Sequence, residues 1–149
     1  MGIAEARRIA RELALLTVYC KNFREAIKLR QCQQEVWELI DEEEFDFRDI
    51  DEEAKCFCDR LLQAFEMHKK TADQLIEQHL EGWDIERLNL LDLSVLELAV
   101  CELLGIDDVG YKVTISEAVN LSKKYSSNRA PFLINAVLDS IAAKLGLKS

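Results

Sequence analysis

The longest nearly continuous hydrophobic stretch of the chain is residues 90–104, LLDLSVLELAVCELL. At about 100° per residue its polar positions fall on different faces of a helix; they are Asp92, Ser94, Glu97 and Glu102. A helix that is apolar nearly all round is either a membrane span or the centre of a core. Three carboxylates in fewer than about 20 residues exclude a span, so the pattern predicts a buried central helix.

Residues at both ends of this stretch are typical of helix boundaries. Asn89 is a common N-cap residue type, and Asp92 suits the positive first turn of a helix. Gly105 follows where a left-handed glycine often ends a helix. Because a buried helix needs neighbours on every side, we expect other helices to surround it.

Apolar residues recur at helical spacing in several other parts of the chain. We expect helices at residues 4–20, 23–40, 52–81, 114–125 and 130–145, and a short element at 83–88. Thr114 and Glu117 form a Thr-x-x-Glu capping box, which predicts that the helix over 114–125 begins there. Pro131 suits the first turn of the last helix, and Gly146 suits its end. The acidic run 41–53 lacks a glycine for a calcium loop and is interpreted as a solvated connection.

The composition places the chain in the all-α class. It has 149 residues, one proline and five glycines, and 49% of its residues are hydrophobic. That length is typical of a single domain with a substantial core. We expect about seven helices in two packed bundles around the central helix, with subdomains at roughly 1–81 and 82–149.

The formal net charge of −9 is unevenly distributed along the sequence. Residues 1–30 and 111–149 each carry +4, whereas residues 31–60 carry −9 and residues 61–110 carry −8. If the two ends meet in the fold, this acidic protein acquires one basic face.

The five cysteines do not indicate disulfides or a metal centre. Their number is odd, no Cys-x-x-Cys pair occurs, and the charged N-terminus does not resemble a secretory signal. Free thiols in a reducing cytoplasm are therefore expected. Cys56 and Cys58 would point about 200° apart on one helix, which excludes them as neighbouring zinc ligands.

No catalytic motif stands out in the sequence. It contains no glycine-rich phosphate loop, no nucleophile elbow and no paired-carboxylate pattern. We therefore predict that the protein is not an enzyme and has no cofactor, no metal and no membrane segment.

A cluster of arginines marks the first helix. Arg7, Arg8 and Arg11 fall within about 100° of one another, opposite the apolar face. Arg7 and Arg11 are i,i+4 neighbours and could bind adjacent phosphates. The residues alone fit either a solvated helix face or a phosphate-binding face.

Several blocks of the sequence resemble the transcription antitermination factor NusB family. In the last third they are DVGYKV (108–113), ISEAV (115–119), LSKKY (121–125) and INAVLD (134–139). The central helix, DLSVLELAVCEL (92–103), and the N-terminal ARRIARE (6–12) are also similar to runs of that family. The resemblance covers most of the chain and is weakest over residues 21–55.

This resemblance implies a specific biological role. The family has two packed helical subdomains and binds boxA-type single-stranded RNA of ribosomal RNA operons. It forms a heterodimer with the ribosomal protein NusE and acts in the RNA polymerase antitermination complex. We therefore expect a cytoplasmic RNA-binding protein with these partners. The sequence does not decide whether the free chain forms a homodimer.

The candidate RNA-binding residues combine cations with groups that contact bases. Cations hold the RNA backbone, while aromatic and amide side chains stack on or hydrogen-bond to unpaired bases. The candidates are Arg7, Arg8, Arg11, Lys112, Lys123, Arg129, Phe132 and Asn135. For Phe132, ordinary core packing is the more common role of such a residue, and Asn135 could equally brace the last helix.

The sequence departs from the family at several of these places. Where the family usually has proline, asparagine and phenylalanine, this chain has Gly110, Ser116 and Leu133, respectively. In the central helix, Glu97 replaces an arginine, and the turn containing Arg129 lacks the acid that many relatives carry. Two alternatives stay open: the RNA-binding domain of an rRNA cytosine methyltransferase, and a helical scaffold without an RNA role.

Overall fold

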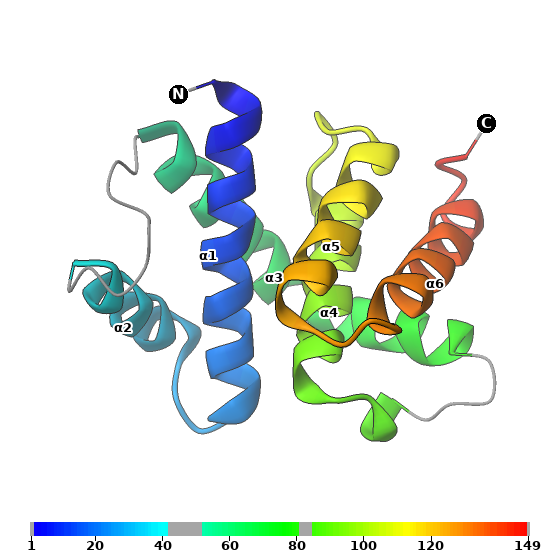
Figure 1. Ribbon diagram of the computed structural model, residues 1–149, viewed down its shortest axis with the longest axis horizontal. Helices are drawn as coiled ribbons and strands as arrows, with labels where there is room; N and C mark the ends of the chain where they lie inside the picture. The colour runs from blue at the N-terminus through cyan, green and yellow to red at the C-terminus, as the bar shows by residue number, and fades with distance from the viewer. Residues whose placement is uncertain (1, 42–51, 81–84, 149) are drawn as a thin grey trace. The chain divides into compact units, whose positions relative to one another are not determined.

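The computed structural model describes residues 2–41, 52–80 and 85–148. These residues form six α-helices and one 3-10 turn, and the described part contains no strand (Figure 1). The helices are α1 (Ile3–Phe23), α2 (Leu29–Asp41), α3 (Glu52–His79), α4 (Leu90–Gly105), α5 (Tyr111–Tyr125) and α6 (Ala130–Lys144), and the turn η1 is Ile85–Arg87. The predicted all-α class is confirmed. None of the described helices is both long enough and apolar enough to cross a bilayer.

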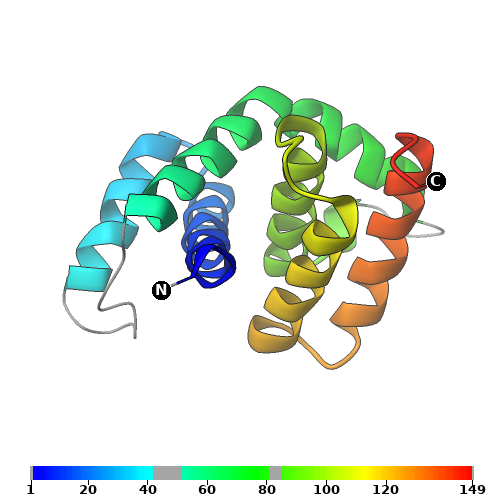
Figure 2. The same cartoon turned by 90° about the horizontal axis from the view of Figure 1, so that it is seen from above.

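The chain divides into two compact units, Met1–Leu62 and Gln63–Ser149, which we call unit 1 and unit 2. The division falls inside α3, whereas the sequence suggested subdomains meeting near residue 81. In unit 1, α2 packs against α1; in unit 2, α4, α5 and α6 lie side by side (Figure 2). A long helix with an unbroken apolar period contributes residues to both cores, because its buried positions continue along its whole length.

The central helix α4 is buried as predicted. Every residue from Ser94 to Glu102 is buried, and α5 and α6 both pack against the helix. Asn89 is the N-cap, and its Oδ1 accepts a 2.8 Å hydrogen bond from the Asp92 backbone N–H. Asp92 also accepts a 2.6 Å bond from the Ser126 hydroxyl, which links the start of α4 to the turn between α5 and α6.

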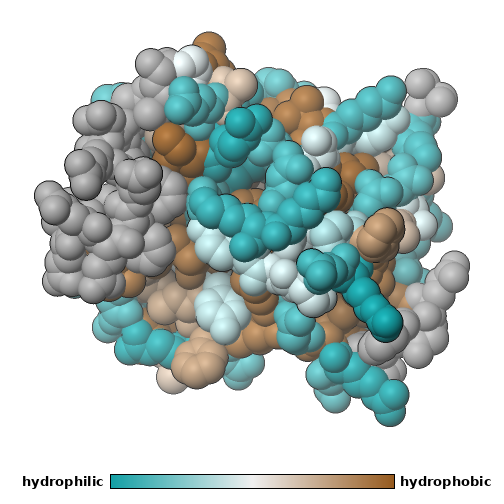
Figure 3. All heavy atoms as spheres, in the orientation of Figure 1, coloured by the Kyte–Doolittle hydropathy of each residue, from teal (hydrophilic) through white to brown (hydrophobic). Residues whose placement is uncertain are grey.

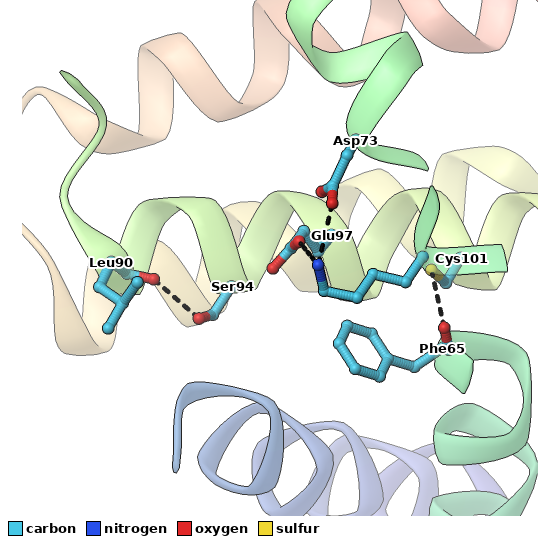
Figure 4. Close-up of polar contacts among 7 residues, drawn as sticks. Phe65, Asp73, Leu90, Ser94, Glu97 and Cys101 are labelled. Carbon is cyan, nitrogen blue, oxygen red and sulfur yellow. Dashed lines mark hydrogen bonds and ion pairs between the residues drawn. The ribbon is translucent and has the colours of Figure 1, made fainter. Parts of the chain in front are cut away.

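A charged cluster lies between α3 and α4 in unit 2 (Figure 4). Lys69 Nζ is 3.0 Å from Asp73 Oδ2 and 3.4 Å from Glu97 Oε2. Glu97 is only 1% exposed, so the nearby charge of Lys69 stabilises its buried carboxylate. Burial alone would lower the pKa of Lys69, but the hydrogen bonds and charges of Asp73 and Glu97 outweigh it and raise that pKa.

Two weaker polar contacts lie in the same region, one within α4 and one between α4 and α3. The Ser94 hydroxyl donates to the Leu90 carbonyl at 2.7 Å, within α4 (Figure 4). The Cys101 thiol is 4.0 Å from the Phe65 carbonyl of α3. Burial raises the pKa of Cys101, since a thiolate there would lose its solvation.

Two predicted boundaries near the start of the chain are wrong. α1 continues to Phe23 instead of ending near Cys20, because residues 21–23 contain no helix breaker. α2 begins at Leu29 instead of Phe23, which leaves an exposed Ala26 and a half-buried Ile27 in the connection.

The capping-box prediction for α5 is also wrong. The helix begins at Tyr111 after Gly110, so Thr114 lies one turn inside it. Thr114 is 2% exposed, and its hydroxyl donates a 2.6 Å hydrogen bond to Glu102 Oε2 of α4 instead of accepting from a backbone N–H. The Thr114 hydroxyl therefore bonds to a residue of another helix, although the local pattern predicted that it would cap α5.

The two glycines expected at helix ends have different roles. Gly146 follows α6 with a φ of +74°, as a left-handed C-terminal glycine should. Gly105 is the last residue of α4, and the position after it, Ile106, is extended. A Cβ added at Gly105 would lie 2.8 Å from the Ala64 Cβ of α3, so this glycine permits a close helix contact instead of a left-handed turn.

The last helices otherwise follow the sequence. α5 ends at Tyr125, and α6 runs from Ala130 to Lys144 with Pro131 in its first turn. Three predictions fall wholly or partly outside the described residues. They are the end of α3 near Gly82, the short element at 83–88 and the acidic run 41–53.

Candidate nucleic-acid interface

A groove lies between α5 and α6 in unit 2. It consists of two hollows of about 550 Å³ and about 600 Å³, which share Val119, Lys123 and Asn135 as lining residues. Ser127, Asn128, Pro131 and Phe132 complete the first hollow. The second adds Tyr111, Lys112, Ile115, Ser116, Asn120, Asp139 and Lys148. We call this continuous surface the α5–α6 groove.

Helical spacing explains why these side chains line one groove. Lys112, Ser116 and Lys123 recur at i, i+4 and i+11 along α5, so they share a face. Phe132, Asn135 and Asp139 recur at i, i+3 and i+7 along α6. The side chains over α5 and α6 are mostly hydrophilic in the space-filling view, with hydrophobic patches between them (Figure 3).

The groove brings together four of the predicted RNA-binding residues: Lys112, Lys123, Phe132 and Asn135. Phe132 is 79% exposed, so its more common role, core packing, is wrong here. Asn135 is exposed and lines both hollows, and in the described residues it braces no other element. An exposed ring, an amide and two lysines together supply what an unpaired nucleotide needs.

Arg129 lies beside the groove and does not line it. It is the N-cap residue of α6, is exposed, and follows Asn128, which does line the first hollow. Asp139 of α6 is paired with Lys148 at 3.0 Å, and no ion pair between Asp139 and Arg129 is observed among the described residues. The Arg129 side chain is therefore exposed next to the first hollow.

The sequence analysis missed several groove residues: Asn120, Ser127, Asn128 and Lys148. Asn120 could have been found, because it lies two turns after Lys112 on the same face of α5. Lys148 follows the last helix, and no local pattern predicts that it contacts Asp139. Its position depends on the turn at Gly146.

The three N-terminal arginines lie in unit 1 and differ in exposure. Arg8 is exposed, Arg7 is half-buried, and Arg11 is only 4% exposed. The expectation that all three share one outer face is therefore wrong for Arg11. Helical spacing placed Arg11 away from the apolar side of α1, but α3 packs over that position.

A buried ring of α3 explains the position of these arginines. The guanidinium carbons of Arg7 and Arg11 lie 4.7 and 5.0 Å from the centroid of Phe57, which is 1% exposed. Arg60 lies 5.5 Å from the same ring, and Arg7 Nε is 3.7 Å from Glu53 Oε1. Guanidinium groups stack favourably on aromatic rings, so Arg7 and Arg11 hold α1 against α3 and Arg8 is the most accessible of the three.

The helical fold and the basic, aromatic groove are typical of a small helical RNA-binding protein. The sequence matches the NusB family over residues 8–143, and the chain belongs to that family. It is 33% identical over 137 residues to transcription antitermination protein NusB of Clostridium botulinum (strain Kyoto / Type A2), covering 89% of this chain and 96% of the relative. The NusB of Thermodesulfovibrio yellowstonii is 32% identical over 143 residues, 91% of each chain.

Solved structures show the same fold. The NusB structure from T. maritima superposes with a TM-score of 0.79 at 30% identity, covering 93% of this chain and 91% of that one. A structure of antitermination factors NusB and NusE in complex with dsRNA superposes with a TM-score of 0.79 at 26% identity, covering 94% and 98%. Family membership confirms the predicted antitermination class and the prediction that the protein is not an enzyme.

Proposed function

We propose that this protein binds boxA-type single-stranded RNA of ribosomal RNA operons together with the ribosomal protein NusE. It does so in the cytoplasm, as part of the RNA polymerase antitermination complex. The observation that carries the proposal is the α5–α6 groove, in which Lys112, Lys123, Phe132 and Asn135 meet on one exposed surface. The solved complex of antitermination factors NusB and NusE with dsRNA, a structural neighbour of this chain, supports NusE and RNA as the kinds of partner.

Four side chains of the groove have a defined role in this proposal. Lys112 and Lys123 contact two separate backbone phosphates, because both are exposed on one face of α5. Phe132 stacks on an unpaired base, and the Asn135 amide hydrogen-bonds to a base edge beside it. Arg8 and Arg129 add electrostatic contacts, whereas the buried Arg11 acts through the position of α1.

NusE supplies affinity that this chain lacks by itself. The net charge of −9 repels RNA at long range, so only the local basic surface attracts it. A basic partner reverses this repulsion, and coupling between partner and RNA is typically about 1–3 kcal/mol. Without NusE the chain is expected to bind RNA weakly, and sedimentation of the free protein will show whether it forms a homodimer.

A filter-binding titration tests the proposal. A boxA-like single strand and the same sequence as a duplex are titrated with and without NusE. Phe132→Ala should weaken single-strand binding by about 1–3 kcal/mol, the usual contribution of one stacked base. Lys112→Ala with Lys123→Ala should lower the salt slope by about 0.7 for each phosphate that the lysines no longer neutralise.

Lys144→Ala is the matched control, because Lys144 is an exposed lysine of α6 that does not line the groove. Its salt slope and affinity should equal those of the parent. Unchanged binding in the groove variants would exclude the groove as the RNA site. Absence of RNA binding even with NusE would favour the scaffold alternative.

A further inference from the structure

The second hollow of the α5–α6 groove contains a carboxylate. Asp139 of α6 lines this hollow together with Lys112, Lys123 and Lys148, and it is the one acidic residue among the described residues of the lining. A carboxylate repels the phosphates of a nucleic acid, so Asp139 does not help to bind the RNA backbone. Its two oxygens only accept hydrogen bonds. A ligand group that binds to Asp139 must therefore carry hydrogen-bond donors.

Lys148 occupies both oxygens of this carboxylate in the structure without RNA. Its Nζ lies 3.0 Å from Oδ1 and 3.0 Å from Oδ2 of Asp139. The side chain of Lys148 is 39% exposed and that of Asp139 is 51% exposed, and ion pairs that are open to water contribute little to stability. A ligand can therefore displace Lys148 from Asp139 at low cost. The released ammonium group is then available to a phosphate.

An amide lies one helical turn before this pair of acceptors. Asn135 precedes Asp139 by four residues on α6, so the two side chains are neighbours on one face, and both line the second hollow. The amide of Asn135 offers N–H donors, whereas the carboxylate of Asp139 offers two acceptors. The hollow has a volume of about 600 Å³, which is within the usual size of a small-molecule site.

Guanine is the RNA base whose edge matches this set of donors and acceptors. Unpaired bases are recognised through hydrogen bonds to their Watson–Crick edges. That edge of guanine has two adjacent donors, N1–H and the N2 amino group, beside the O6 acceptor. Adenine, cytosine and uracil each place one donor there, next to acceptors that a carboxylate repels. A mismatched base would leave polar groups of the site unpaired, which is costly.

We propose that Asp139 selects guanine in the second hollow, an inference that rests on the RNA-binding function proposed above. Asp139 accepts hydrogen bonds from guanine N1–H and N2–H, and the amide of Asn135 donates to O6. Lys148 moves from the carboxylate to the RNA backbone. Phe132 lines the first hollow and stacks on the adjacent base. The groove therefore reads one base by hydrogen bonds and holds its neighbour by stacking.

Fluorescence anisotropy with short labelled RNAs tests the proposal. The full-length protein with NusE is titrated into oligouridines whose central base is uracil, guanine, hypoxanthine, adenine or cytosine. We expect the guanine probe to bind about tenfold more tightly than the uracil probe, which is within the usual discrimination of a bidentate contact. Hypoxanthine lacks the N2 amino group and should lose part of this preference. Adenine and cytosine should lose nearly all of it.

Asp139→Asn keeps the shape of the side chain and replaces one acceptor with a donor. The ratio of guanine to uracil affinity should therefore fall close to one, although the loss of a negative charge raises the affinity for every probe. Lys148→Ala should lower the affinity for all probes and keep the ratio. Glu77→Gln is the matched control, because it removes the same charge at an exposed position of α3 outside the groove, and it should also keep the ratio. Thermal melts check that each variant is folded.

The possible outcomes separate this inference from the function on which it rests. A guanine preference that Asp139→Asn abolishes and Glu77→Gln keeps would support the assignment. Equal binding of the guanine and uracil probes by the parent, or an unchanged preference in Asp139→Asn, would overturn it and leave the groove as the RNA site. If no probe binds even with NusE, the proposed RNA-binding function is wrong, and the guanine assignment is wrong with it.

Discussion

The hydroxyl of Thr114 donates a 2.6 Å hydrogen bond to the carboxylate of Glu102, and both residues are 2% exposed. The bond joins α5, one turn after its start, to the last part of α4, and α5 forms one wall of the groove. A buried carboxylate is costly unless hydrogen bonds compensate its charge. This contact therefore stabilises unit 2 and fixes where α5 starts.

Thr114→Val tests this contact, because valine keeps the shape of threonine and removes the donor. The variant leaves Glu102 with one bond fewer in a buried site, so we expect the free energy of unfolding to fall by about 1–3 kcal/mol. Urea denaturation measures the change. Thr71→Val, on the exposed surface of α3, is the control and should change stability by less than about 0.5 kcal/mol. Equal stability of the two variants would show that the bond contributes nothing.

Lys69→Met tests the charged cluster between α3 and α4. The change removes the ammonium group that lies 3.4 Å from the buried carboxylate of Glu97. Because Lys69 is partly exposed, we expect a loss of about 1–3 kcal/mol, less than for a fully buried pair. Lys70→Met, at the exposed neighbouring position, should be nearly neutral. Adding Glu97→Gln should restore part of the stability that Lys69→Met loses, because it removes the buried charge. If it restores none, the loss does not come from the Lys69–Glu97 contact.

The same cluster predicts a pH dependence. Its contacts raise the pKa of Lys69 above the ordinary value of 10.5, so the folded state holds this proton more tightly than the unfolded state does. The contribution is complete below about pH 10.5 and is lost as the pH rises through the higher folded pKa. The stability difference between the parent and Lys69→Met should therefore be constant near neutral pH and shrink above about pH 10.5. A difference that shrinks on acidification from pH 8 to pH 6 instead would contradict this assignment.

Gly105→Ala tests the close contact of α4 with α3. The new Cβ would lie 2.8 Å from the Ala64 Cβ and 3.1 Å from His68 Cδ2, so the helices must shift. We expect a loss of about 1–3 kcal/mol from overpacking, which exceeds the gain in helix propensity. Gly110→Ala is the control for added volume, because nothing lies within 4 Å of its Cβ position. Gly110 is the N-cap of α5, so this variant should lose only the smaller cost of an unfavourable cap residue. If both variants have the same melting temperature, the close approach does not constrain the fold.

Arg8→Ala and Arg11→Ala should separate RNA binding from stability. Arg8 is exposed, so its loss should lower the salt slope of RNA binding by about 0.7 with little change in melting temperature. Arg11 is 4% exposed and stacks on Phe57, so its loss should lower stability by about 1–3 kcal/mol. Thermal melts and salt titrations of both variants measure the two effects. If Arg8→Ala lowered stability and Arg11→Ala changed only the salt slope, the roles given to the two arginines would be wrong.

Local patterns in the sequence predicted much of the fold. Asn89 and Gly146 act as the predicted cap and helix end because both signals depend on a few adjacent residues. The partner of Thr114 and the packing over Arg11 depend on which helices meet, and helical periodicity does not specify that. Lys112 and Phe132, which the sequence suggested as RNA-binding residues, both line the groove, but only the packing of α5 beside α6 brings them together.

Arg129→Asp tests the edge of the groove. Arg129 is exposed at the N-cap of α6, and no described residue forms an ion pair with it, so charge reversal should weaken RNA binding by electrostatic repulsion. Because aspartate is a good N-cap residue, the melting temperature should stay the same or rise slightly. Lys70→Asp makes the same charge reversal at an exposed site of α3 outside the groove, and it should reduce RNA affinity less. If Arg129→Asp and the parent bind RNA equally well at low salt, Arg129 does not belong to the RNA site. The site would then comprise only the residues that line the groove.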